Sequence, residues 1–89
     1  AFRKLFSKSP IKRIKRDRFV RNVLIACGNS GDNSLISEII PLLSDASELV
    51  RAMSVWAIKE LAPLEFTAQR TIYIGKETDE NVLKEWNDD

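Results

Sequence analysis

The sequence predicts an all-α fold: a short helical repeat, or α-solenoid, of about five helices that follows a basic N-terminal arm. Two observations support this fold class. Apolar residues recur at helical spacing in successive stretches that are bounded by glycine, proline and small polar residues. Related residues also return at a period of 31 to 32 residues, which is typical of repeat units built from two helices.

The chain of 89 residues is expected to form one domain, with an arm or connector over residues 1–16 and the helical repeat over residues 17–89. In the arm, basic and apolar residues are interleaved, and Pro10 disfavours a helical conformation at Ser9. A repeat unit buries its apolar face against a neighbouring unit, and the sequence begins with Ala rather than Met. We therefore expect a fragment of a longer protein or a terminal cap of a repeat array.

The first predicted helix begins at Asp17, a suitable N-cap residue, and carries apolar side chains on one side. These side chains are Phe19, Val20, Val23, Leu24 and Cys27. The opposite side carries Arg18, Arg21, Asn22 and Ile25. Gly28 is predicted to end the helix, and "GNSGD" (28–32) is interpreted as the turn that follows. A phosphate-binding loop is the weaker interpretation, because the segment follows a helix and lacks the lysine of such loops.

A second helix is predicted to start at Asn33 or Ser34, and its N-terminus could accept one phosphate. Its buried stripe would comprise Leu35, Ile36, Ile39, Ile40 and Leu43. Pro41 falls inside this pattern, so the helix is predicted to be bent or broken there. Ser47 is a suitable cap for a third helix over roughly residues 48–61. The inward side chains of that helix would be Leu49, Val50, Met53, Trp56, Ala57 and Leu61.

The pattern over the C-terminal part of the chain is less regular. Residues 64–75 suit a helix closed by Gly75, although "TIYI" (71–74) alone could form a strand, for which no partner strand is visible. A last helix is predicted over residues 79–86, and its apolar face comprises Val82, Leu83 and Trp86. Trp86 is expected to close the repeat or to pack against a domain outside this sequence.

The internal repeat is carried by two alignments. Phe19, Ala26 and Cys27 align with Val50, Ala57 and Ile58 at an offset of 31. "DASELV" (45–50) then corresponds to "ETDENV" (77–82) at an offset of 32. Arg51, which follows the first of these segments, is predicted to bridge adjacent units rather than to bind a ligand.

Several kinds of chemistry are excluded by composition. The chain has no histidine, the commonest general base and metal ligand, and one cysteine, which cannot form an intrachain disulfide. Cys27 lies on an apolar stripe with no group to activate it, so we expect a buried structural thiol. We therefore predict no catalytic, metal-binding or cofactor-binding residue in this chain, and a small independent enzyme is the least favoured interpretation.

The charge is strongly divided along the chain. Residues 1–21 hold nine basic residues and one acid, a net charge of +8, whereas residues 22–89 carry a net charge of −7. Such asymmetry favours a surface that faces a polyanion, and clustered arginines match phosphate geometry. The predicted RNA-binding residues are Lys8, Lys12, Arg13, Arg16, Arg18 and Arg21. The alternatives are a solvated charged face, or pairing of Arg13 or Arg21 with carboxylates of a missing domain.

Two further alternatives concern location and role. No apolar run approaches the length of a membrane span, and the first residues lack the apolar centre of a signal peptide, so a cytoplasmic protein without membrane contact is expected. A short helical repeat also commonly serves as a scaffold for protein partners, which would require an exposed apolar or acidic groove and no affinity for RNA.

The segment "LFSKSPIKRIKRDRFVRNVLIACGNSGD" (5–32) resembles the start of the C-terminal HEAT-like region of bacterial epoxyqueuosine reductases. Members of that family share a Ser-Pro pair before a basic segment, an Arg-Asn pair entering an apolar helix, and a Gly-Asn turn. Here these features are Ser9-Pro10, Lys12-Arg13, Arg21-Asn22 and Gly28-Asn29. "LVRAMSVWAIKEL" (49–61) resembles the next repeat, and "ETDENVLKEW" (77–86) resembles the end of some members.

The resemblance implies a parent oxidoreductase that reduces epoxyqueuosine to queuosine in the anticodon loop of certain tRNAs. That family uses cobalamin and two [4Fe–4S] clusters, held by catalytic and ferredoxin-like domains that precede the repeats. The resemblance therefore implies a non-catalytic HEAT-like fragment over residues 17–89, whose partners are the tRNA anticodon arm and the N-terminal domains of its own parent chain. The alternative remains a HEAT-like scaffold for protein partners.

Overall fold

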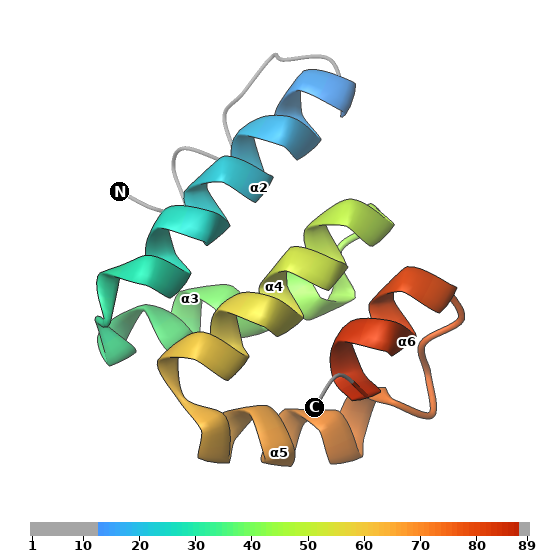
Figure 1. Cartoon of the computed structure of the whole chain (residues 1–89). Coiled ribbons are helices and arrows are strands. Elements are labelled where there is room, and N and C mark those ends of the chain that lie inside the picture. The colour runs from blue at the N-terminus through green and yellow to red at the C-terminus, as the bar shows by residue number, and fades with distance from the viewer. Residues whose placement is uncertain (1–12, 88–89) are drawn as a thin grey trace.

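The computed structural model describes residues 13–87, and this part of the chain is built from helices and turns without a strand (Figure 1). The α-helices are α2 (Arg13–Ser30), α3 (Ile36–Ile39), α4 (Glu48–Leu61), α5 (Pro63–Tyr73) and α6 (Glu80–Asn87). Short 3₁₀ helices, Asn33–Leu35 and Ile40–Ser44, flank α3. The prediction of an all-α fold is confirmed for the described residues, and the alternative strand at 71–74 is wrong because α5 runs through Tyr73. No described helix is both long enough and apolar enough to cross a bilayer.

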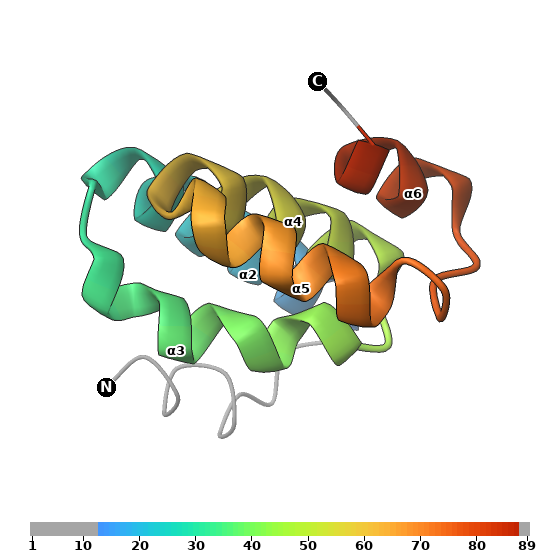
Figure 2. The same ribbon diagram turned by 90° about the horizontal axis from the view of Figure 1, so that it is seen from below.

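Helix α4 lies at the centre of the fold. Helix α2 packs along one side of it and α6 along the other, so that three helices stand in a row (Figure 1). The helical segment 33–44 and α5 cover other parts of α4, and segment 33–44 runs along one edge of the molecule (Figure 2). The fully buried side chains of the core come from all parts of this arrangement, and the largest include Leu24, Ile39, Val50, Ile58, Val82 and Trp86.

The first helix starts earlier than the sequence pattern predicts. Helix α2 is already formed at Arg13, so the helix crosses the predicted boundary between residues 16 and 17. Asp17 lies inside the helix and is not its N-cap. Its Oδ1 atom instead accepts a hydrogen bond from Nη1 of Arg16 at 3.0 Å. The basic residues of segment 13–16 therefore belong to a regular helix rather than to an arm.

The end of α2 also differs from the prediction. Gly28 does not stop the helix, which continues to Ser30. Gly31 follows with φ of +72°, the left-handed conformation that glycine adopts without steric cost and that commonly follows a helix. The side chain of Ser30 donates a hydrogen bond to the carbonyl oxygen of Cys27 at 2.7 Å and so satisfies part of the last turn.

Gly28 has a different task, which is to let α4 approach α2. A Cβ atom at position 28 would collide with Cζ3 of the Trp56 indole and lie 2.9 Å from its Cη2. The indole therefore rests directly on the backbone of α2. Only glycine leaves room for this contact, and no sequence pattern around residue 28 predicts the contact with Trp56.

Replacement of Gly28 by leucine is expected to lower the free energy of unfolding by about 2–3 kcal/mol, because every added atom must displace the indole of Trp56. The matched control is Gly75→Leu, since nothing lies within 4 Å of a Cβ at that position. Chemical denaturation followed by far-UV circular dichroism measures both variants. Equal losses for the two variants would contradict the close approach at Gly28.

The second predicted helix is broken, as Pro41 indicates. The α-helical hydrogen bonding ends at Ile39, and the chain continues as a 3₁₀ helix whose start contains Pro41, which has no N–H to donate. The N-terminal cap of the preceding 3₁₀ helix, Asn33–Leu35, is Asp32, which lies one residue before the predicted start. The Oδ1 atom of Asp32 accepts hydrogen bonds from the hydroxyl and the backbone N–H of Ser34, at 2.6 and 3.0 Å, and these bonds lower the pKa of Asp32.

Helix α4 has the predicted bounds, and Ser47 caps it by accepting a hydrogen bond from the N–H of Val50 at 3.4 Å. Its buried side is wider than predicted: Ser54, Val55 and Ile58 are fully buried, whereas Leu49 is 37 % exposed. The reason is that neighbours cover α4 from several directions. An amphipathic stripe is the pattern of a helix that packs on one side only.

The predicted sequence repeat has a structural counterpart in two turns. In each turn an acidic side chain accepts a hydrogen bond from the backbone N–H two residues later, and a capping side chain accepts one from the N–H three residues beyond itself. The residues are Asp45, Ser47 and Val50 in the first turn, and Glu77, Asp79 and Val82 in the second. Both valines are fully buried, so each turn positions the first core residue of the helix that follows.

The last helix is held by Trp86, which is 2 % exposed. Its ring stacks with Tyr73 of α5, with centroids 6.3 Å apart, and packs tilted against Phe66 at 5.4 Å. Arg70 of α5 adds polar contacts, since Nε donates to the carbonyl oxygen of Trp86 at 3.0 Å and Nη2 donates to Oδ1 of Asn87 at 2.7 Å. Trp86 thus closes the fold against α5 within this chain.

Candidate nucleic-acid interface

Helix α2 carries five basic residues within its first nine positions, Arg13, Lys15, Arg16, Arg18 and Arg21. Val20, Leu24 and Cys27 turn one side of this helix into the core, and the opposite side faces solvent. Lys15 and Arg18 are exposed on that side. A helix of this kind can present cations to a phosphate backbone without disturbing its own packing.

The six predicted RNA-binding residues have different surroundings. Lys8 and Lys12 lie outside the described residues, and Arg13 begins α2. Arg18 is exposed to solvent. Arg21 is half-buried at the edge of the same side, where its Nη2 and Nε atoms lie 3.2 and 3.4 Å from Oδ1 of Asn22.

Arg16 is engaged inside the protein. Its two terminal nitrogens donate to the two carboxylate oxygens of Asp45, at 2.9 and 2.7 Å, and Nη1 also contacts Asp17. Hydrogen bonding to Asp45, followed by that to Asp17, raises the pKa of Arg16 despite partial burial. The pair joins α2 to the turn before α4. RNA binding by Arg16 stays a prediction, and an RNA phosphate would have to compete with Asp45 for the guanidinium.

The predicted RNA-binding residues omit Lys15 and Asn22, although Asn22 is correctly predicted to share the side of Arg18 and Arg21. Both are exposed, and together with Arg18 they follow the i, i+3, i+7 spacing of one helix face. The helical spacing of Lys15 is visible in the sequence, but a prediction that segment 13–16 is irregular hides it. We define the α2 basic face as Lys15, Arg18, Arg21 and Asn22.

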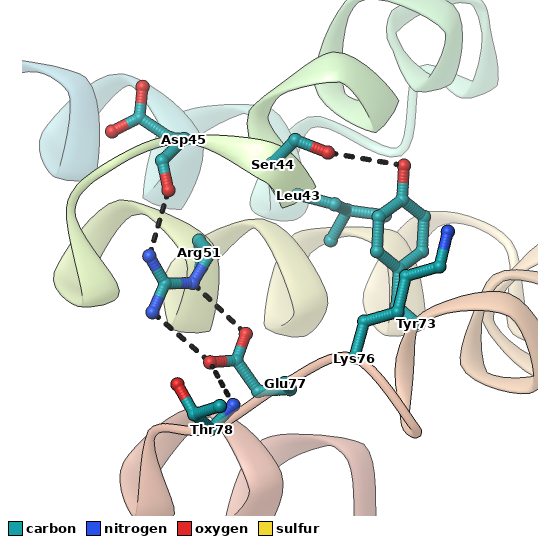
Figure 3. Close-up of a pocket in the computed structure, with 8 residues that line it drawn as sticks. All are labelled: Leu43, Ser44, Asp45, Arg51, Tyr73, Lys76, Glu77 and Thr78. Carbon is teal, nitrogen blue, oxygen red and sulfur yellow. Dashed lines mark hydrogen bonds and ion pairs between the residues drawn. The ribbon is translucent and has the colours of Figure 1, made fainter.

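A second candidate is the polar hollow between the two repeated turns, of about 280 Å³ (Figure 3). Arg51 lies across it: Nε and Nη2 donate to the two carboxylate oxygens of Glu77 at 3.0 and 3.1 Å, and Nη1 donates to the carbonyl oxygen of Asp45 at 2.8 Å. The hydrogen bond to Glu77 is the main cause that raises the pKa of Arg51. Burial acts to raise the pKa of Glu77, but hydrogen bonds from Arg51 and the N–H of Asp79 outweigh it and lower that pKa. Arg51 thus connects the turn before α4 to the turn before α6, and the prediction that it makes contacts within the protein is confirmed.

The remaining polar groups of this hollow also interact with one another. The hydroxyl of Ser44 donates to that of Tyr73 at 3.4 Å, and the ammonium of Lys76 lies 5.8 Å from the centre of the Tyr73 ring (Figure 3). A ligand would have to displace these contacts. The hollow is therefore a joint between two turns and a poorer candidate for a binding site than α2.

Nucleophilic chemistry has no support among the described residues. Cys27 is buried, and burial, with a smaller contribution from the charge of Asp32, raises the pKa of its thiol. A raised pKa disfavours the thiolate, which is the reactive form. Within residues 13–87 no group of three or more carboxylate, thiol or imidazole side chains is placed to hold a metal ion.

Comparisons of the chain with family models, with curated proteins and with solved structures found no match.

Proposed function

We propose that this chain is a HEAT-like helical-repeat domain that contacts tRNA and belongs to an epoxyqueuosine reductase, the enzyme that reduces epoxyqueuosine to queuosine in the anticodon loop. The observation that carries the proposal is the α2 basic face, where Lys15 and Arg18 are exposed on a regular helix. The cytoplasmic location predicted from the sequence is part of the same proposal.

Two features support the α-solenoid within this proposal. The two turns repeat the same hydrogen-bond pattern at an offset of 32 residues. Each turn also receives an arginine from a preceding helix, Arg16 for the first and Arg51 for the second. Units that are linked only to their neighbours are the organising feature of solenoid proteins.

The iron–sulfur clusters of the parent family do not fit the residues of this chain. A [4Fe–4S] cluster takes four cysteine ligands, whereas the sequence contains one cysteine, which is buried. We propose that cobalamin and both clusters reside in the catalytic and ferredoxin-like domains of the parent protein. The role of this domain would then be to hold the anticodon arm by its backbone, since A-form RNA is recognised largely through shape and phosphates.

A titration of the chain with an anticodon stem-loop RNA at several salt concentrations tests the proposal. We expect affinity to fall steeply with salt. Arg18→Ala should lower the slope of log K against log salt by about 0.7–0.9, the contribution of one phosphate contact. Arg16 is unsuitable for this test, because its loss would break the ion pair with Asp45.

The matched control is Leu64→Ser on α5, which removes an exposed apolar side chain and no charge. It should leave both the affinity and the salt slope unchanged. Binding that is independent of salt, or unaffected by Arg18→Ala together with Lys15→Ala, contradicts the proposal.

The same titration addresses the second candidate, a scaffold for protein partners. On α5, Leu64 is 89 % exposed and Ile72 is 50 % exposed, with Ala68 between them at the i, i+4, i+8 spacing of one helix face. This apolar face is the specific observation in favour of a scaffold. Absence of any RNA affinity in the titration would favour this second function over the first.

A further inference from the structure

A hollow of about 310 Å³ lies between α2, α4 and α6, and the proposed phosphate contacts do not use it. Its lining is mainly apolar and comprises Ile25, Asn29, Ala52, Met53, Trp56 and Glu85. A cavity of about 150 Å³ is enough to hold a benzene ring, so this volume suits a larger flat ring system.

Trp56 gives this hollow an aromatic wall. Its six-membered ring is fixed against the backbone of α2 at Gly28, and the side chain remains partly accessible to solvent. Met53 lies beside it, one helical turn earlier on α4. The other tryptophan, Trp86, is 2 % exposed and enclosed by α5. Trp56 is thus the tryptophan that a ligand can reach.

The α2 basic face leads into the hollow. Ile25 follows Arg21 by four residues and Arg18 by seven, so all three lie along the same side of α2. At a rise of 1.5 Å per residue, the two arginines stand about 6 and 10 Å from Ile25 along the helix axis. A strand whose phosphates contact these arginines would reach the hollow with its next nucleotides.

We propose that the hollow holds an unpaired nucleobase of the bound RNA, stacked on Trp56, while Arg18 and Arg21 contact the adjoining phosphates. This inference rests on the proposed function. The lining distinguishes a base from a phosphate here, because it is mainly apolar and suits a flat ring better than an anion. The Asn29 amide at its edge can both donate and accept hydrogen bonds. Aromatic stacking beside a basic surface is the usual means of binding single-stranded RNA.

The test compares two RNAs with equal numbers of phosphates: an anticodon stem-loop, and the same stem-loop with abasic sites at its unpaired positions. Affinity and tryptophan fluorescence are measured for each. We expect removal of the stacking bases to weaken binding by about 5- to 140-fold, and the intact loop alone to quench Trp56. The salt slope should be the same for both RNAs, because the phosphates are retained.

Trp56→Leu should abolish the difference between the two RNAs and leave the affinity for the abasic RNA unchanged. Because Trp56→Leu also removes the packing of the indole on Gly28, a second variant is needed. Asn29→Ala at the exposed rim should weaken binding of the intact loop only. Leu64→Ser again serves as the unaffected control.

Equal affinity of the unchanged chain for both RNAs would overturn the inference and leave the phosphate contact standing. Loss of salt-dependent binding to both RNAs would instead overturn the proposed function itself. A change in Trp56 fluorescence that follows protein concentration without RNA would show that a second copy of the chain covers the hollow, and would also overturn the inference.

Discussion

Trp86→Ala is expected to lower the free energy of unfolding by about 3–5 kcal/mol, the usual range when a fully buried tryptophan is truncated. The side chain is 2 % exposed and packs against Phe66 and Tyr73, so its loss removes the main apolar contact between α5 and α6. Domains of this size have a total stability of roughly 5–15 kcal/mol. The substitution should therefore remove a large fraction of the total stability.

Denaturant unfolding followed by far-UV circular dichroism measures this loss. Ile72→Ala is the control, because Ile72 lies on the same α5 but is 50 % exposed, and a surface substitution of this kind changes stability by about 0.5 kcal/mol or less. Trp86→Phe keeps an aromatic ring and should fall between the two. A loss below about 1 kcal/mol for Trp86→Ala would mean that α6 contributes little to the cooperative fold.

The second large effect is expected at the ion pair between Arg51 and Glu77. The two side chains are 18 % and 7 % exposed, and removal of one partner from a buried pair typically costs about 3–5 kcal/mol. Since Arg51 is partly solvated, we expect Arg51→Met to cost about 2–3 kcal/mol. The exposed Arg18→Met is the matched control. Arg51→Met combined with Glu77→Gln should recover part of the loss, because no buried carboxylate is then left without its partner.

The pair also makes stability depend on pH. The pKa of Glu77 is lowered from its ordinary value of 4.5, so its contribution is fully present above that value and is lost as pH falls through the lowered folded pKa. Glu77→Gln lacks this contribution at every pH. The difference in unfolding free energy between the two proteins should therefore shrink on acidification, and a difference that stays constant would show that Glu77 is not charged in the fold.

Parts of the fold are predictable because local chemistry decides them. Helix α4 has its expected bounds because Ser47 caps its start and Pro63 follows its end. Pro41 removes a backbone donor and breaks the second helix wherever the surrounding residues lie. The repeat at an offset of 32 was also visible, because the same capping chemistry recurs in both turns.

Other parts depend on residues that are distant in sequence. Gly28 resembles a helix stop by composition, and only the indole of Trp56 shows that it serves a close approach instead. In the sequence Arg16 cannot be distinguished from the other basic residues of its segment, and only the structure shows that it pairs with Asp45. The wider burial of α4, including Ser54, follows from neighbours on several sides, which a stripe on one helix does not encode.

For the candidate site, the sequence indicates the basic character of the surface, but not its full membership or the hollow beside it. Arg18 is exposed as predicted, whereas Lys15 joins it only because α2 begins at Arg13. Trp56 is predicted to be an inward core residue, because helical spacing alone does not distinguish a side chain covered by protein from one that borders an open hollow.

Asp45 has an unusual position in this molecule. Its carboxylate accepts hydrogen bonds from Arg16 of α2, and its carbonyl oxygen accepts one from Arg51. Arg51 also donates to Glu77 in the turn before α6. One residue thus links α2 and α4 to the turn before α6 along this edge. A substitution of the Asp45 side chain would release Arg16 of α2 and leave the backbone contact to Arg51 in place, so it would loosen one side of α4 selectively.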